Sequence, residues 1–394
     1  MNYPAIPLSW NHFGWSRAGS SLLCTAVATA LVLLAASQAV LGQAPLPVSP
    51  PKQVRDHYVA LQSSAPSMPG EYAQLYVRER LADVSLSEDG KGQVVLFIHG
   101  AGTPAEVAFD VPHADYSWMG YLARHGFSTY AMDMTGYGRS TRPSVMNDRC
   151  NLSAPQQEEL FGSACAPSFG SAATTMASDW DDIDAVVDFL RSKHGVARVH
   201  LVGWSQGGPR AAGYAFKQPD KVANLVLLAP AYNREAAATA EQAPIAGAAM
   251  TKQSRSDFFS GWERQTGCEQ QVDAAVAELI WQDMLASDPV GTTWGDGVRR
   301  APRTPTFGWT PQEVAATRAP VLTVIGLLDS QVQPERVRHF HADLGTSNKV
   351  LLELPCASHN AMWEKDAQLL FDASREWLLG TSWQGQRSGT YVLE

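Results

Sequence analysis

The stretch Gly203-Trp204-Ser205-Gln206-Gly207 follows a short, largely apolar run at residues 199–202 and precedes a segment that reads as a helix. It matches the pattern G-x-S-x-G, in which the two glycines permit a sharp turn from a strand into a helix. Such a turn lifts the serine hydroxyl above the edge of a sheet. As a bare pattern the match is weak, but between a strand and a helix it is strong. We therefore predict that Ser205 is a nucleophile.

Strands and helices alternate on both sides of this turn. Runs of buried-strand length are separated by segments whose apolar residues recur with the period of a helix. The predicted strands are 72–81, 94–98, 128–132, 199–202, 225–228, 321–325 and 350–354, and the main predicted helices begin near 118, 178, 206, 334 and 366. Strand, helix and strand at this spacing predict βαβ units and a mostly parallel sheet.

Residues 232–315 break the alternation. They contain no convincing strand and are rich in alanine, glutamine and aromatic residues, and about 80 residues are too many for a loop. We predict a mainly helical cap. Aromatic residues of a cap pack internally more often than they contact a ligand. Trp262 and Trp281, with Trp204 beside the nucleophile, are the candidate substrate-binding residues.

The N-terminal residues 1–44 have the composition of a secretory signal. Arg17 is followed by an apolar run at 22–41 and by small residues that favour cleavage near Ala44. The alternative is an uncleaved membrane anchor, since about 20 apolar residues can span a bilayer. We predict an exported protein with a proline-rich linker at 45–71 and a C-terminal tail at 381–394.

Export makes the remaining cysteines informative, because disulfides persist in oxidising compartments. Four follow the signal, at 150, 165, 268 and 356. A bond between Cys150 and Cys165 closes the shortest loop and is the predicted disulfide. Cys268 and Cys356 then either pair or stay free, and a bond between them would tether the cap to the last loop of the sheet. The spacings match no zinc pattern.

Composition excludes several classes of protein. The 394 residues carry a net charge of −9, and charged residues are 18% of the chain. An acidic chain without a basic stripe is not a nucleic-acid binder. We expect a small-molecule substrate as the partner, and membrane contact only through the N-terminal signal or anchor. The oligomeric state is left open.

A serine hydroxyl needs a base to take its proton, and the base needs a third group to orient it. On a parallel sheet these groups lie at the carboxyl ends of later strands. Asp329 follows one such strand and His359 follows the next, which gives the chain order Ser205, Asp329, His359. Glu235, at the start of the insertion, and Glu353, within a strand, are the lesser candidates for the acid.

The negative charge that develops on a substrate carbonyl needs backbone N–H donors already in place. One is expected from Gln206, directly after the nucleophile. The second is expected from the turn after the strand at 94–98, with Ala101 as the first candidate and Gly102 as the second. His99 in the same turn is a rival candidate for the base, and we interpret it as structural.

Taken together, these motifs resemble the α/β-hydrolase superfamily, and specifically its cap-bearing serine hydrolases: esterases, aminopeptidases and haloperoxidase-like enzymes. The matching residues are His99-Gly100-Ala101-Gly102, the turn 133–140, Gly203–Gly208, Gly326–Asp329 and Ser358-His359. The resemblance implies an eight-stranded sheet in residues 72–231 and 316–380, a cap inserted after the sixth strand, and neither cofactor nor metal. It also implies that the turn 133–140 is structural. Epoxide hydrolases and haloalkane dehalogenases carry Asp where this chain has Ser205, so those activities are disfavoured.

We therefore expect a serine hydrolase that cleaves a carboxylic ester with an apolar or aryl group through an acyl-enzyme on Ser205. The first alternative is an amidase or aminopeptidase, for which Glu263, Glu269 and Asp283 could bind a free amino group. The second is a catalytically silent binding protein of the same fold, which the intact set of motifs disfavours.

Overall fold

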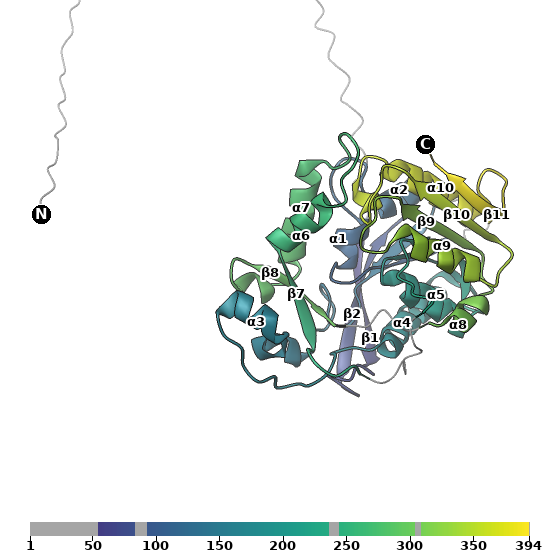
Figure 1. Cartoon of the computed structure of the whole chain (residues 1–394). Helices are drawn as coiled ribbons and strands as arrows, with labels where there is room; N and C mark the ends of the chain where they lie inside the picture. The colour runs from purple at the N-terminus through teal and green to yellow at the C-terminus, as the bar shows by residue number, and fades with distance from the viewer. Residues whose placement is uncertain (1–53, 83–92, 236–243, 304–308, 394) are drawn as a thin grey trace, which may run out of the picture. The chain divides into compact units, whose positions relative to one another are not determined.

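A nine-stranded sheet runs through the part of the chain that the computed structural model describes, residues 54–82, 93–235, 244–303 and 309–393. Its order is β1-β2-β4-β3-β5-β6-β9-β10-β11, and only the pairs β1–β2 and β2–β4 are antiparallel. The mostly parallel α/β architecture is thus confirmed (Figure 1). The strands are β1 Val54–Gln62, β2 Tyr72–Arg80, β3 Val94–Ile98, β4 Ser128–Met132, β5 Val199–Trp204, β6 Val222–Leu228, β9 Val321–Gly326, β10 Lys349–Leu354 and β11 Ser388–Val392.

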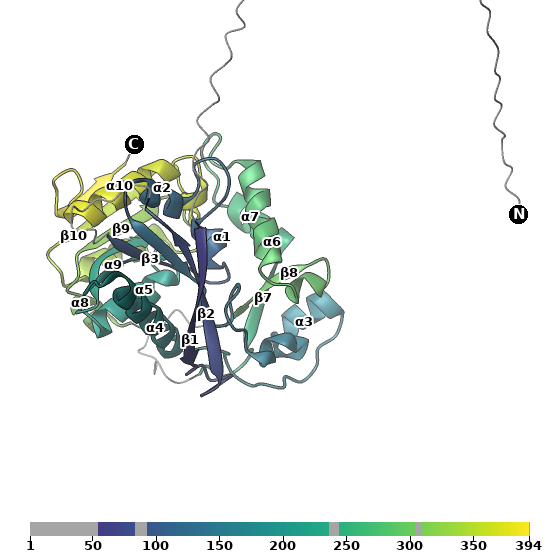
Figure 2. The same ribbon diagram turned by 180° about the vertical axis from the view of Figure 1, so that it is seen from behind.

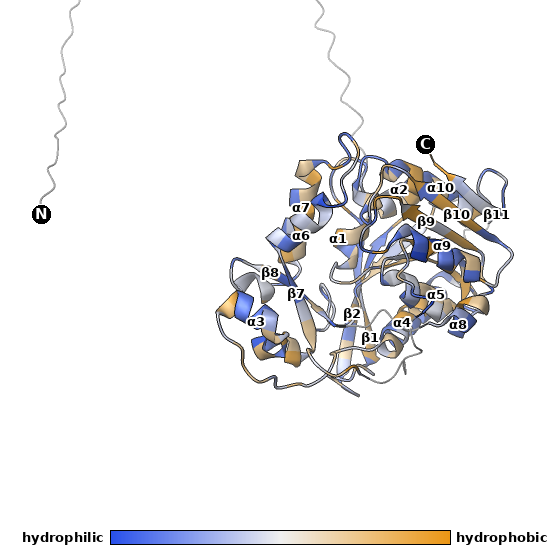
Figure 3. Ribbon diagram, viewed as in Figure 1, coloured by the Kyte–Doolittle hydropathy of each residue, from blue (hydrophilic) through white to orange (hydrophobic). Residues whose placement is uncertain are grey.

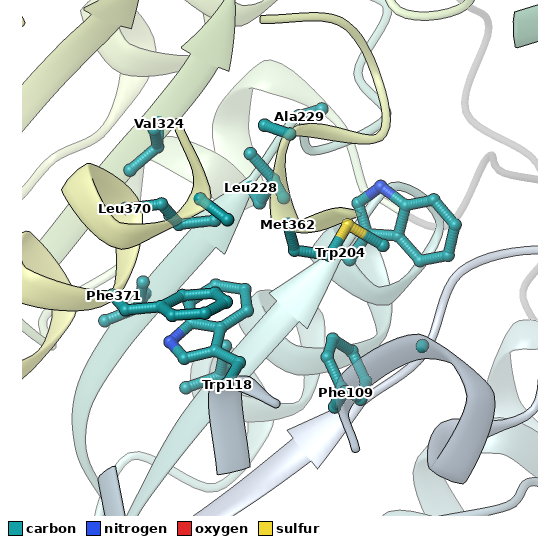
Figure 4. Packing of buried hydrophobic residues seen from close by; sticks show 14 of the residues in the cluster. Phe109, Trp118, Trp204, Leu228, Ala229, Val324, Met362, Leu370 and Phe371 are labelled. Atoms are coloured by element: carbon teal, nitrogen blue, oxygen red, sulfur yellow. The ribbon is translucent and has the colours of Figure 1, made fainter. Parts of the chain in front are cut away.

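Both faces of the sheet are covered by helices, as the alternation along β3 shows. Val95 and Phe97 belong to one apolar cluster, whereas Leu96 and Ile98 belong to the other. The first cluster includes side chains of α1 Ala105–Phe109, α2 Trp118–Arg124 and α10 Ala367–Gly380, and the second includes those of α4 Met176–His194 and α5 Gly207–Lys217. Figure 2 shows these helices from behind, and Figure 4 shows part of the first cluster, where Trp118 stacks on Phe371. Strand β9 is mostly hydrophobic, whereas α9 Pro334–Asp343 beside it is hydrophilic (Figure 3).

Two predictions about the ends of the chain are wrong. Residues 54–62 of the expected linker form β1, which pairs with β2 along nine residues. Residues 388–392 of the expected tail form β11, which pairs with β10. Both are edge strands with mostly exposed or half-exposed side chains. They lack the continuous apolar runs by which the inner strands were recognised, and they raise the strand count from the expected eight to nine.

The insertion follows β6, as expected. It contains α6 Arg255–Glu263 and α7 Ala274–Ala286, but also a two-stranded antiparallel sheet of β7 Met250–Ser254 and β8 Val298–Pro302. The prediction of a cap without strands is therefore wrong. The two strands were missed because they are short and carry polar residues. Helix α8 Pro311–Ala315 packs against α5 and α9 and so belongs to the core rather than to the cap.

The loop closed by the Cys150–Cys165 disulfide joins the cap. The bond is present, with the two Cα atoms 5.3 Å apart. Helix α3 Ala154–Phe161 lies within this loop and beside the two-stranded sheet β7–β8 (Figure 1). Met146 and Leu152 pack with Met250, Trp294 and Val298 of the insertion. The loop of residues 150–165, which was assigned to the core from the sequence, therefore packs against the cap.

The predicted signal peptide at 1–44 lies outside the described residues. Among the residues that the structure does describe, none of the helices combines the length and the apolar character that a membrane crossing requires.

Helix α4 begins earlier than expected. Thr175 is its N-cap, and Ser178, the expected start, is the third residue of a capping box with Thr175. Gly195 ends the helix in the left-handed conformation. The buried carboxyl of Asp182 on this helix accepts a hydrogen bond from the Thr135 N–H (2.8 Å), which holds the turn 133–140 against the helix.

Burial raises the pKa of Asp182 to about 7. In an unfolded chain an aspartate titrates near pH 4, at about 3.9. Between these values the folded protein holds a proton that the unfolded chain has lost, so this group lowers the free energy of unfolding as the pH rises from about 4 to about 7. We expect Asp182→Asn, which keeps an oxygen for Thr135, to gain about 2–3 kcal/mol relative to the wild type between about pH 5 and pH 8. Urea unfolding of both proteins at each pH measures this gain, and a relative loss at the higher pH would refute the assignment.

Candidate active site

Ser205 sits on a strained turn between β5 and α5. Its φ is +57°, a conformation rarely adopted by residues other than glycine. The turn has no room for side chains beside it: a Cβ on Gly203 would lie 2.4 Å from the Gly207 carbonyl oxygen, and one on Gly207 would lie 2.2 Å from the Ile98 oxygen. The Ser205 N–H donates to the Leu228 oxygen at 2.9 Å, which fixes the turn to β6. The G-x-S-x-G interpretation therefore describes the observed backbone.

The predicted base and acid are joined. His359 Nδ1 lies 2.7 Å from Asp329 Oδ2, and both side chains are buried. The other oxygen of Asp329, Oδ1, accepts the N–H groups of Gln331 and Val332, each at 2.8 Å. Asp329 therefore acts as an acceptor on both oxygens, so that Nδ1 carries a proton and Nε2 is left as the basic nitrogen. Glu353 instead binds Arg338 at 2.7 Å, and Glu235 is exposed, so neither is the acid.

Ser205 and His359 line one cavity of about 610 Å³. Within the described part of the chain no hydrogen bond joins the Ser205 hydroxyl to the imidazole. In enzymes without a ligand such bonds are often long and tighten when the substrate binds. The structure thus brings Ser205 and His359 to one cavity, with Asp329 bound to the imidazole behind it, and completes one of the two contacts that the three residues need.

Of the predicted backbone donors for a substrate oxyanion, Ala101 lies in the cavity of Ser205, and Gln206 and Gly102 line the adjoining one. Ala101 lines the same cavity as Ser205, and no acceptor for its N–H is found in the described residues. A Cβ on Gly100 would lie 2.9 Å from Ser205 Cβ, so the loop approaches the nucleophile closely. Gln206 follows Ser205 at the start of α5, and Gln206 and Gly102 line a second cavity of about 600 Å³ that also includes Ala101.

His99 is structural, as predicted. The Met134 N–H donates to its Nε2 at 3.1 Å, so the proton is on Nδ1, which donates to the Gly100 oxygen at 2.8 Å. Burial lowers the pKa of His99 to about 3, and the Arg210 cation adds to this effect. A neutral ring in this position holds the loop of Gly100 and cannot serve as the base.

Arg210 also holds the loop of His99 and Gly100 in place. Its guanidinium is fully buried, pairs with Asp179 at 2.7 Å, and donates to the His99 and Gly100 oxygens at 3.0 and 3.3 Å. Removing one partner of such a pair leaves a buried charge without compensation. The turn 133–140 is structural too, since Asp133 accepts the N–H groups of Ala105 and Arg139.

The three candidate tryptophans have different places. Trp204 and Trp262 line the cavity of Ser205, and Trp204 also donates from Nε1 to the His359 oxygen at 2.8 Å. Trp281 lies outside that cavity and is buried inside the cap, stacked on Phe258, so its prediction as a substrate-binding residue is wrong. Phe258 and Trp363 line the cavity without having been predicted.

The cap is tied to both catalytic loops by residues that sequence reasoning missed. Gln265, just after α6, accepts the N–H groups of Ser330 and His359 on its side-chain oxygen, at 3.1 and 3.4 Å. Glu364 accepts from Trp262 Nε1 and from the Ser358 N–H, both at 2.8 Å. No local pattern marks these residues, because their contacts with the cap or from the cap join segments 65 to 102 residues apart in the chain.

The second pair of cysteines acts at the same place. Cys268 and Cys356 form a disulfide with their Cα atoms 5.7 Å apart. The bond joins the segment after α6 to the loop that carries His359, which is the tether that the sequence left open. Among the described residues no group of three or more His, Cys, Asp or Glu side chains is arranged to hold a metal ion.

Comparison with known proteins agrees with this fold. The family model described as alpha/beta hydrolase fold matches residues 93–366, so the chain belongs to the α/β-hydrolase family. The 2-hydroxy-6-oxo-6-(2'-aminophenyl)hexa-2,4-dienoic acid hydrolase of Metapseudomonas resinovorans is 26% identical over 165 residues, 41% of this chain and 43% of that protein. The (E)-2-((N-methylformamido)methylene)succinate hydrolase of Acinetobacter baylyi is 24% identical over 193 residues, 49% of this chain and 57% of that protein.

The chain thus spans about half the length of these curated relatives. A crystal structure of a hydrolase from Pseudomonas aeruginosa superposes with a TM-score of 0.52 at 17% identity, covering 82% of this chain and 98% of that one. At this identity the likeness shows the fold alone.

Proposed function

We propose that the protein is an exported serine hydrolase that cleaves a carboxylic ester through an acyl-enzyme on Ser205. The observation that carries the proposal is the hydrogen bond between His359 and Asp329, together with the cavity that His359 and Ser205, on its strained turn, line. The same constellation of nucleophile, base and acid activates serine on several unrelated folds.

In the proposed mechanism the Ser205 hydroxyl attacks the ester carbonyl while His359 Nε2 takes its proton. Asp329 holds the proton on Nδ1 and stabilises the imidazolium. The N–H groups of Ala101 and Gln206 bind the oxyanion, and His359 then gives the proton to the leaving alcohol. Water repeats the cycle on the acyl-enzyme and releases the acid.

The cavity supports an ester rather than a peptide. Glu263 and Glu269, which could have bound an amino terminus, are exposed and do not line it, and Asp283 lines a different cavity. Asp257 does line it, but its carboxylate accepts from the Ser254 N–H at 2.9 Å and from Lys252 at 3.3 Å. Trp204, Phe258, Trp262 and Trp363 supply an aromatic wall for an apolar or aryl group.

Export is part of the proposal. Two disulfides favour an oxidising compartment, in agreement with the signal-like residues 1–44.

The proposal is tested with a panel of p-nitrophenyl esters and aminoacyl-arylamides on the full chain without residues 1–44. We expect ester turnover with little or no arylamide turnover. Faster cleavage of the arylamides would favour an aminopeptidase, and cleavage of neither class would favour a silent binding protein.

A further inference from the structure

Arg299 of β8 reaches the cavity of Ser205 from the two-stranded sheet of the cap. It lines both the cavity of Ser205 and the adjoining cavity of Gln206 and Gly102. Its Nη1 packs on Gly102, where an added Cβ would lie only 1.5 Å away. Gly100 of the same loop lies against Ser205, and two residues of backbone span at most about 7 Å. The guanidinium is therefore within the length of a small substrate from the nucleophile.

Arg299 differs from its neighbours Lys252 and Arg300 in having no acidic partner among the described residues. Its Nε donates to Gln253 Oε1 at 2.9 Å, but no carboxylate in the described residues lies within ion-pair distance. By contrast, the neighbouring Arg300 pairs with Asp288 at 2.6 Å, and Lys252 pairs with Asp257 and Glu159. Asp257 and Asp288 are near enough to act on Arg299 only at longer range.

The surroundings of Arg299 make an anion favourable there. Burial lowers its pKa to about 10, which leaves the guanidinium charged at neutral pH. A partly desolvated cation without a counter-ion is costly, and a bound carboxylate removes that cost. The planar guanidinium can donate two parallel hydrogen bonds to a carboxylate. Gln253 holds Nε, so Nη1 and Nη2 are the donors left for a ligand.

We infer that Arg299 binds a carboxylate on the substrate, so that the ester cleaved at Ser205 is an anionic one. The inference rests on the proposed function and narrows its substrate class. The aromatic wall takes the apolar part of the substrate, and Arg299 fixes the charged end at the loop of Gly102. Arg299 is a specificity-determining residue in this account.

The test compares two matched pairs of esters that differ in one charge. In the first pair, mono-p-nitrophenyl glutarate and p-nitrophenyl pentanoate differ in the acyl part; in the second, 4-acetoxybenzoate and phenyl acetate differ in the alcohol part. We expect the wild type to prefer the charged member of at least one pair in kcat/KM. Arg299→Met should lower kcat/KM for that charged ester by about 100-fold, mainly through KM, and change the neutral ester by less than about threefold. Arg299→Lys, which keeps the charge but not the paired donors, should fall between.

Arg255→Met is the matched control, because Arg255 is an exposed arginine of the cap that lines neither cavity and pairs with Glu278, so its loss should leave the charge preference unchanged. If Arg299→Met does not fold, the wild type alone still decides: we expect glutarate or benzoate to slow the labelling of Ser205 by a fluorophosphonate, and pentanol not to. Preference for the neutral ester in both pairs, or an equal loss on charged and neutral esters in Arg299→Met, would overturn the inference. Absence of turnover on every ester would instead overturn the proposed function.

Discussion

Ser205→Ala is expected to lower kcat for the best ester by about 10⁴-fold or more. In the proposed mechanism the hydroxyl oxygen forms the acyl-enzyme, and alanine has no group that can replace it. The backbone of the turn is held by the N–H of Ser205 and the oxygen of Leu228, so the substitution leaves the fold in place. Steady-state kinetics with p-nitrophenyl esters, together with thermal unfolding of the variant, measure the effect.

Ser330→Ala is the control for this variant. Ser330 is another serine of the same cavity, but it is exposed and only its backbone N–H is bound, by Gln265. We expect its turnover to stay within a few-fold of the wild type. Substantial activity in Ser205→Ala, or a comparable loss in Ser330→Ala, would place the nucleophile elsewhere.

Asp329→Asn is expected to have the next largest effect, a loss in kcat of about 10⁴-fold, the size known for the same change in a serine protease triad. The asparagine oxygen can still accept the N–H groups of Gln331 and Val332, which now bind Oδ1. Its amide then donates toward His359 Nδ1 and stabilises the tautomer with the proton on Nε2. That nitrogen can no longer take the serine proton.

Glu353→Gln tests whether the rival residue Glu353, rather than Asp329, is the acid. Glu353 is the rival acidic residue by sequence, yet it binds Arg338 and not His359. We expect its turnover to remain close to that of the wild type. Near-normal activity in Asp329→Asn, or a large loss in Glu353→Gln, would contradict the account.

The sequence predicted what depends on local pattern. The turn at Ser205 was predicted because its glycines and the strand before it lie within a few residues of it. The proximity of Asp329 and His359 was predicted because a parallel sheet gathers the carboxyl ends of its strands at one edge. The inner strands of the sheet were found from their continuous apolar runs.

What the sequence could not supply depends on long-range contacts or on weak local signals. Edge strands β1 and β11 are largely exposed and carry no apolar run. Gln265 and Arg299 act only because the cap is folded over the sheet, and neither belongs to a motif. Trp281 was misplaced for the same reason, since composition does not tell the inner face of a cap from its cavity wall.

The most direct test of the central claim is labelling of the protein with a fluorophosphonate, followed by mass spectrometry of its peptides. The account predicts one adduct per chain on Ser205, no adduct in Ser205→Ala, and much slower labelling in Asp329→Asn. An adduct on another residue, or an unlabelled wild type that is folded, would contradict it.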